Sequence, residues 1–249
     1  MGRSSLLLGL AVLLSACAAH PGNPQHPAAL TRSIAIVSAL GPNILVGSTG
    51  GPASENTSES VAVPDWDLDG VALAAARTEL SRRFEVASAS RAPDQAPGRP
   101  ALASTAAILD AARDGVLTPV PADLILVLSL SNTAQNQQGH PTVDYGVGVS
   151  KWRSPLSIVR PAYVHTFLAV TLIDGRSQTV ITQASLKMKA REPSLLGATE
   201  TLPFVPLESF EWHNHWADMT NRQHEQIHQL LTTLLKEAVP YTLEKMPLR

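Results

Sequence analysis

The sequence predicts a single α/β domain of the α+β kind, in which a mixed, largely antiparallel sheet packs with about three helices. Three observations lead to this prediction. The chain has 249 residues, 44% of them hydrophobic, which is enough for one domain with a sizeable core. Short runs of β-branched and apolar residues recur along it. These runs alternate with three segments whose apolar residues have helical spacing.

Two strands are expected to open the domain. Ile34 to Val37 and Ile44 to Val46 are β-branched runs. The Gly41-Pro42-Asn43 sequence between them is typical of a turn, so we expect a hairpin. The glycine-rich and polar residues 47–60 are then expected to form a loop.

The middle of the chain continues the alternation of helices and strands. The expected elements are a helix at 70–83, a strand from 84, an alanine-rich helix at 101–113 and a strand at 124–130. Asp67 or Asp69 can cap the first of these helices. The last segment is continuously apolar, which is typical of a strand buried on both faces.

The last third is expected to contain three strands and the clearest helix. The strands lie at 143–149, 162–173 and 178–188, followed by an irregular loop at 190–210. Asp174-Gly175 predicts a hairpin with a type I′ turn, which needs positive φ at both central residues. Thr220 and Gln223 predict a capping box. The helix carries one apolar stripe and is expected to end before Pro240; the stripe consists of Ile227, Leu230, Leu231, Leu234, Leu235 and Ala238.

The first residues carry the most specific motif. Arg3 precedes an apolar run that is too short to span a bilayer as a mature helix. The run ends in Leu14-Ser15-Ala16-Cys17, which resembles the lipobox of bacterial lipoproteins. The resemblance implies cleavage before Cys17 and lipidation, including palmitate, of that cysteine. Ala18 stands where Asp would retain the protein in the inner membrane, so the resemblance implies an outer-membrane lipoprotein facing the periplasm.

These features divide the chain into 1–16 as signal peptide, 17–32 as lipidated tether and 33–249 as the single periplasmic domain. The alternative is an ordinary signal peptide with an incidental cysteine. Cleavage leaves 18 basic residues against 21 acidic ones, because Arg3 is the one charged residue removed. This mildly acidic balance gives no case for nucleic-acid binding. The single cysteine excludes an internal disulfide framework.

One motif is typical of an enzyme. His224-Glu225-Gln226-Ile227-His228 matches H-E-x-x-H, in which two histidines one helical turn apart bind zinc and the glutamate acts as a base. However, only 21 residues follow His228, and they offer Glu244 as the late carboxylate ligand. A helical wheel also places Glu225 nearly opposite the apolar stripe. We therefore favour a capped amphipathic helix, with a zinc-dependent hydrolase as the alternative.

Trp212-His213-Asn214-His215-Trp216 adds a second possibility for metal. In an extended segment both histidines point to the same side, so they could join His224 and His228 in a non-catalytic site. The alternative, which we favour, is that the tryptophans anchor the segment and the histidines face water.

Three weaker patterns have structural explanations. The Gly47 to Gly51 run lacks the lysine of a phosphate-binding loop, although a small-ligand cleft lined by Ser48, Thr49 and Trp66 is possible. The alternating carboxylates Asp65, Asp67 and Asp69 are better explained by helix capping than by calcium binding. A basic stripe at period 2 is typical of a solvated strand face that could touch anionic lipid; it consists of Lys187, Lys189 and Arg191.

The two ends of the domain resemble an uncharacterised family of proteobacterial envelope proteins. The resemblance rests on Ser33 to Gly41, Trp66 to Asp69, and Trp216 to Leu248. It implies an envelope location and no known activity. The order of elements is also loosely similar to that of curli-secretion-type lipoproteins, which is an analogy of fold alone.

We therefore expect a lipid-anchored protein of the outer membrane with a non-catalytic binding or assembly role. Its expected partners are the membrane, through Cys17, and an envelope protein or ligand of unknown identity. We expect no catalytic residue, no metal ligand and no cofactor, so Cys17 is the one predicted site residue.

Overall fold

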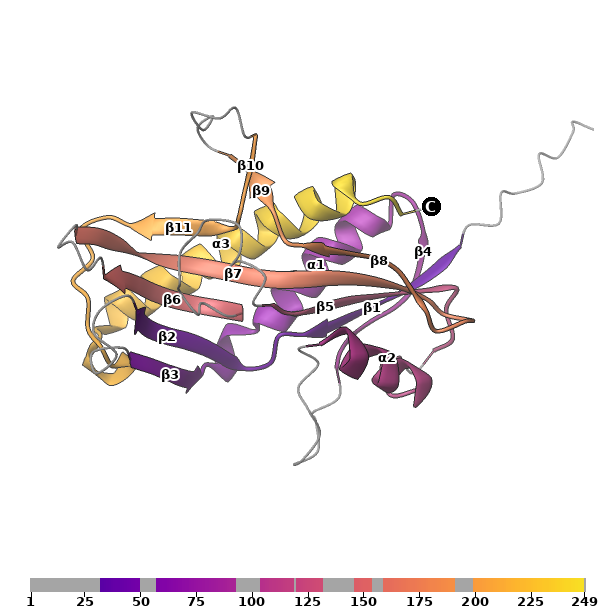
Figure 1. Cartoon of the computed structure of the whole chain (residues 1–249), viewed down its shortest axis with the longest axis horizontal. Helices are drawn as coiled ribbons and strands as arrows, with labels where there is room; N and C mark the ends of the chain where they lie inside the picture. Colours follow the sequence, from indigo (N-terminus) through magenta and orange to yellow (C-terminus); the bar gives the residue numbers. More distant parts are fainter. Residues whose placement is uncertain are drawn as a thin grey trace, which may run out of the picture. The chain divides into compact units, whose positions relative to one another are not determined.

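The computed structural model describes residues 32–49, 57–92, 104–118, 120–131, 146–153, 159–190 and 199–248. Within these ranges, nine strands form one mixed sheet in the order β3-β2-β6-β7-β5-β1-β4, with β8 and β11 also paired to β7 (Figure 1). The strands are β1 Ser33–Ala39, β2 Asn43–Thr49, β3 Thr57–Ala62, β4 Glu85–Arg91, β5 Leu124–Leu130, β6 Gly146–Arg153, β7 Val159–Asp174, β8 Val180–Ser185 and β11 Phe204–Leu207. β9 Met188–Lys189 and β10 Glu200–Thr201 form a separate two-stranded ladder.

The 16-residue strand β7 joins two halves of the sheet. Its first half pairs antiparallel with β6 and β11, and its second half pairs antiparallel with β5 and β8. The parallel pairs are β1 with β4, β1 with β5, and β2 with β6. This arrangement confirms the predicted mixed, largely antiparallel sheet.

Among the described residues, three α-helices pack on the sheet, as predicted, and they divide between its two faces. The helices are α1 Leu68–Leu80, α2 Thr105–Arg113 and α3 Asn221–Lys245. Ile34 and Ile36 of β1 face the large core with α1 and α3, whereas Val37 faces a smaller core under α2. Successive residues of a strand point to opposite faces, so the continuously apolar strands are covered on both sides.

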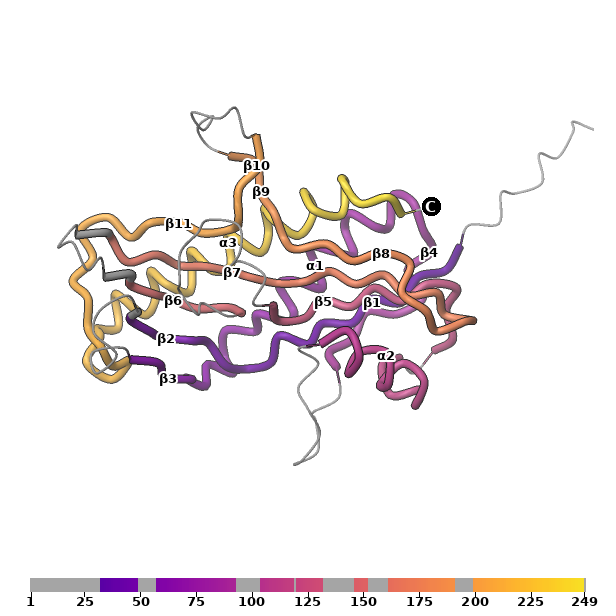
Figure 2. Tube along the Cα trace, in the orientation of Figure 1, coloured from indigo at the N-terminus to yellow at the C-terminus, as the bar shows by residue number. Residues whose placement is uncertain are grey.

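The predicted hairpin between β1 and β2 is wrong. The two strands follow one another along the trace and belong to different halves of the sheet (Figure 2). The bend between them is held by Asp69, whose carboxylate accepts hydrogen bonds from Ser38 Oγ at 2.5 Å, Leu40 N at 3.0 Å and Gly41 N at 3.1 Å. Gly41 has φ +76°, a conformation that glycine adopts readily. The Gly-Pro sequence therefore marks a bend in a continuing path.

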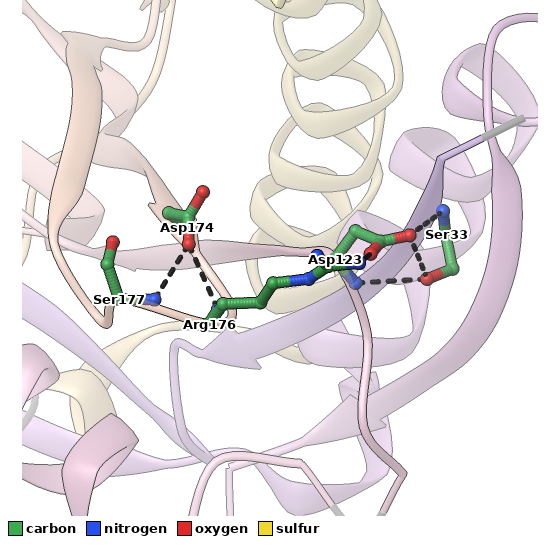
Figure 3. A network of polar contacts seen from close by, with 5 residues as sticks. All are labelled: Ser33, Asp123, Asp174, Arg176 and Ser177. Carbon is green, nitrogen blue, oxygen red and sulfur yellow. Dashed lines mark hydrogen bonds and ion pairs between the residues drawn. The ribbon is translucent and has the colours of Figure 1, made fainter. Parts of the chain in front are cut away.

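The hairpin of β7 and β8 is confirmed, but its turn type is wrong. Positive φ occurs at Gln178, at +54°, and at neither Asp174 nor Gly175. A Cβ on Gly175 would lie 2.0 Å from the carbonyl oxygen of Ala122, so glycine is needed there because another part of the chain passes close by. The Asp174 carboxylate accepts from Arg176 N at 3.0 Å and Ser177 N at 2.8 Å, which shapes the turn (Figure 3).

A polar network ties this turn to the start of the domain. Asp123, just before β5, accepts from the backbone N of Ser33 at 3.0 Å, from its Oγ at 2.9 Å and from Arg176 at 3.1 Å (Figure 3). Ser33 Oγ in turn accepts from Asp123 N at 2.9 Å. The pKa of Asp123 is lowered by the backbone hydrogen bond from Ser33, then by its hydroxyl and by Arg176. The network fixes the first residue of β1 against the residue before β5 and the turn between β7 and β8.

Several element boundaries differ from those predicted. Residues 57–60 belong to β3 rather than to a loop, and the predicted loop at 190–210 contains β10 and β11. Helix α3 does not end before Pro240; it continues to Lys245. Val239, Thr242 and Leu243 are buried around this point, and their packing offsets the backbone hydrogen bond that proline cannot make.

The predicted caps are confirmed. Asp67 caps α1 and accepts from Gly70 N at 3.0 Å. Thr220 and Gln223 form the predicted capping box at the start of α3. Among the helices in the described ranges, none is long and apolar enough to cross a membrane.

Candidate functional site

A pocket of about 350 Å³ lies between β8 and the last turns of α3. Four consecutive residues of β8, Thr182 to Ser185, form one wall. Lys187 and Glu200 come from the segments around the β9–β10 ladder. The helix contributes its C-terminal residues Tyr241, Thr242 and Lys245, and the chain beyond it adds Met246 and Pro247.

Charged and hydrogen-bonding side chains meet in this pocket. The Glu200 carboxylate contacts Lys187 Nζ at 3.0 Å through one oxygen and accepts from the Tyr241 hydroxyl at 3.2 Å through the other. The Nζ atom of Lys245 lies 5.7 Å from the centroid of the Tyr241 ring, within range of a cation–π interaction. Tyr241 and Lys245 are four residues apart, so one face of α3 presents both.

These contacts shift two pKa values away from neutrality. The hydrogen bond from Lys187 lowers the pKa of Glu200 most, and the charges of Lys187 and Lys245 act in the same direction. Burial, followed by the hydrogen bond to Glu200, raises the pKa of Tyr241. At neutral pH the pocket therefore holds an ionised carboxylate at Glu200 and a protonated phenol at Tyr241.

The backbone beside the pocket is fixed by one side chain. Thr242 Oγ1 accepts from Lys187 N at 2.9 Å and donates to Lys187 O at 3.2 Å. Thr242 is 4% exposed, so these bonds satisfy polar groups that would otherwise be buried without partners. The segment leaving β8 is thereby held against the end of α3.

The histidines of the H-E-x-x-H motif lie elsewhere, at the start of α3. The ring of His224 stacks on Trp216 with centroids 3.9 Å apart, and the ring of His228 stacks on Trp66 with centroids 4.8 Å apart. His224 Nε2 lies 3.1 Å from the carbonyl oxygen of Trp216. Because a carbonyl only accepts, this nitrogen carries the proton. The cluster joins the 3₁₀ turns Pro64–Trp66 and Trp216–Asp218 to α3.

A metal site is not assembled among the residues that the structure describes. No group of three or more His, Cys, Asp or Glu residues within those ranges is arranged to hold an ion. His213 is half-buried and His215 is exposed. The Nε1 of Trp212 donates to Asn214 Oδ1 at 3.0 Å. The zinc alternative stays a prediction.

Other predicted residues are separated by the fold or lie outside the described ranges. Cys17 and Arg191 lie outside them, as do residues 50–56 of the predicted cleft. Ser48 is fully buried, and its Oγ has no hydrogen-bond partner among the described residues. Asp65 is exposed, whereas Asp69 is buried at the bend after β1.

Sequence reasoning missed most of the pocket. It singled out Lys187 within the basic stripe but gave no role to Glu200, Tyr241 or Lys245. The spacing of Tyr241 and Lys245 would have been a usable signal if the helix had been extended past Pro240. Glu200 had no such signal, because its contact with Lys187 depends on the fold of the chain between them.

No protein-family model matches the sequence, and no curated protein matches it. The chain is weakly similar to the crystal structure of a Xanthomonas campestris protein that bears the family-model label DUF330. The two share 13% identity at a TM-score of 0.36, over 90% of this chain and 89% of that one. That organism is a proteobacterium, and a likeness this weak carries no argument about function or lipidation.

Proposed function

We propose that this protein is an outer-membrane lipoprotein, anchored through Cys17, whose domain faces the periplasm and binds a partner without catalysing a reaction. The anchor is supported by the Leu14-Ser15-Ala16-Cys17 motif. The binding role is supported by the pocket between β8 and α3, which is the observation that carries the proposal. The periplasmic location follows from the resemblance to lipoproteins that are sorted to the outer membrane.

The chemistry of the pocket supports binding over acid–base catalysis. An effective general acid or base has a pKa near the working pH. The pKa of Glu200 is lowered and that of Tyr241 is raised, so both groups move away from neutrality. The pocket presents fixed charges and a fixed hydroxyl, which suit a partner with complementary charge.

The anchor is tested by metabolic labelling with an alkyne analogue of palmitate. We expect label on the wild-type chain in the outer-membrane fraction and none on Cys17→Ala. The matched control is Ser15→Ala, which changes the motif region but leaves the cysteine in place. Label that survives Cys17→Ala contradicts the proposed anchor.

The binding role is tested by photo-crosslinking in intact cells. A benzoylphenylalanine placed at Thr182 lies in the pocket wall, and one placed at Glu208 lies on an exposed turn that does not line the pocket. We expect an adduct from Thr182 and none from Glu208. Equal adducts at both positions, or none at Thr182, contradict binding at this pocket.

A further inference from the structure

Strand β8 forms an edge of the sheet. Within the described ranges, β7 is the one strand that pairs with it. The edge strand of a sheet can receive a further strand through the backbone groups that point away from its neighbour. Thr182 to Ser185 are consecutive, so their side chains point alternately to the two faces of the sheet. All four residues line the pocket, which therefore lies along the edge of β8 and not on one face of the sheet.

The ladder between β7 and β8 shows which backbone groups point outward. Leu186 N donates to Leu168 O at 2.8 Å, so Leu186 and Leu168 form a hydrogen-bonded pair. In an antiparallel ladder such pairs alternate with pairs whose backbone groups point away from each other. The regular register continues this alternation toward the start of β8, so Ala184 and Thr182 also form hydrogen-bonded pairs with β7. Gln183 lies between them, opposite Thr171, and its N–H and C=O therefore point away from β7.

The pocket also has unbalanced positive charge. Its lining contains two lysines and one carboxylate, and Glu200 pairs with Lys187. Lys245 has no carboxylate within ion-pair distance among the residues that the structure describes. Ile181, at the start of the same edge, is 41% exposed and is one of the large hydrophobic side chains left accessible. An extended acidic segment complements both the backbone edge and Lys245.

We propose that β8 receives an extended acidic peptide segment of a partner protein as an added strand, with a carboxylate of that segment next to Lys245. This inference rests on the proposed binding role of the pocket and identifies the class of its ligand. Backbone hydrogen bonds to Gln183 supply affinity, and Lys245 supplies selectivity for acidic sequences. The carboxylate can be an acidic side chain or the C-terminus of the partner.

The proposal is tested by selecting a displayed library of random peptides on the full-length protein in detergent. We expect enrichment of segments that are rich in β-branched residues and contain Asp or Glu. The best sequence is then synthesised with a free and an amidated C-terminus, and its Kd is measured by fluorescence anisotropy. A loss of binding on amidation identifies the terminal carboxylate as the bound group, and unchanged binding identifies an acidic side chain.

Two variants at Gln183 separate the backbone from the side chain. Gln183→Pro removes the outward N–H at an edge position where proline is tolerated, and we expect Kd to rise about tenfold or more. Gln183→Thr keeps the N–H and is the matched control, with an expected change in Kd below about twofold.

A variant at Lys245 tests the role of the charge. Lys245→Met keeps the aliphatic stem beside Tyr241, and we expect Kd to rise about threefold at low salt and to change little at high salt.

A second measurement keeps the proposal falsifiable if Gln183→Pro does not fold. Hydrogen exchange of the wild-type protein is followed by NMR with and without the selected peptide. We expect the Gln183 amide to exchange at least tenfold more slowly when the peptide is bound. Unchanged exchange at Gln183 overturns strand addition.

Other outcomes also overturn the proposal. These are failure to enrich any peptide that depends on Gln183, enrichment of basic peptides, or self-association through β8 that no peptide disrupts. If the Thr182 adduct forms in cells and the peptide results are negative, the binding role stands and the acidic strand is wrong. If Thr182 gives no adduct, the binding role itself fails.

Discussion

Asp69 is the residue on which the bend between β1 and β2 depends. It is 8% exposed and accepts three hydrogen bonds, two of them from the backbone of Leu40 and Gly41. Asp69→Ala leaves those buried donors without their acceptor, and we expect a loss of about 3 kcal/mol in the free energy of unfolding. Urea denaturation measures this loss. Asp65→Ala, at an exposed position, is the control and should change stability by less than about 0.5 kcal/mol.

Asp123 makes stability depend on pH. Its pKa is lowered from 3.8 in the folded protein, so it stabilises the fold above that pH and loses this contribution as the pH falls through the folded-state pKa. We expect Asp123→Asn to lower Tm at pH 7 and to lower it progressively less between about pH 5 and pH 3. Thermal unfolding followed by circular dichroism measures the trend. An equal drop in Tm at pH 7 and pH 3 would contradict the role given to the carboxylate.

Single residues also show where sequence reasoning succeeds. The capping role of Asp67 was predictable because a cap is a local contact, between residues three apart in the chain. The role of Asp69 was not predictable, because its partners lie about 30 residues earlier, at a bend that was predicted to be a hairpin turn. Asp-Gly at 174–175 predicted the correct hairpin for the wrong reason, since the glycine is required by a contact with Ala122.

At the scale of elements, the start of α3 is set by its capping box. Thr220 Oγ1 accepts from Gln223 N at 3.3 Å, and Gln223 Oε1 accepts from Thr220 N at 2.8 Å. We expect Thr220→Ala to lower the free energy of unfolding by about 1 kcal/mol, measured by urea denaturation. Thr233→Ala, on an exposed part of the same helix, is the matched control. Equal losses in the two variants would show that the cap does not matter.

The start of α3 also carries the two histidines of the zinc alternative. The rings of His224 and His228 stack on two different tryptophans, and His224 uses Nε2 to contact a carbonyl. We therefore expect protein that is stripped with chelator, loaded with zinc and dialysed to retain much less than one zinc per chain, as measured by mass spectrometry of the metal. One zinc per chain that is lost on His228→Ala would instead support the hydrolase.

The far end of α3 shows why a proline is an unreliable stop signal. Proline ends an isolated helix because it lacks an N–H and its ring clashes with the preceding turn. Here the last turns are buried in the large core through Val239 and Leu243, and that packing carries the helix on to Lys245. The misjudged end removed Tyr241 and Lys245 from the predicted helix, and with them the pocket.

At the scale of the whole molecule, the fold class was predictable and the topology was not. Apolar patterns identified the three helices and most of the strands, because each pattern reports local burial. They missed β3, β10 and β11, which lie in segments predicted to be loops. Strand order depends on which distant segments pair, and a turn signal such as Gly41-Pro42 does not distinguish a hairpin from a bend. The pocket depends on that order, since β8 and α3 come from distant parts of the chain.

Strand β7 has a consequence for how the molecule unfolds. Both halves of the sheet use it as a central strand, so neither half can lose its ladder without exposing apolar side chains of the other. Partial opening of one half is therefore costly, and the slowest-exchanging amides of β1 and β2 should report the same global free energy. Many strand pairs of the sheet also join segments that are distant in the sequence, which predicts slow folding relative to a helical protein of equal length. A chain secreted across a membrane would then spend an extended time with its edge strands accessible to other chains.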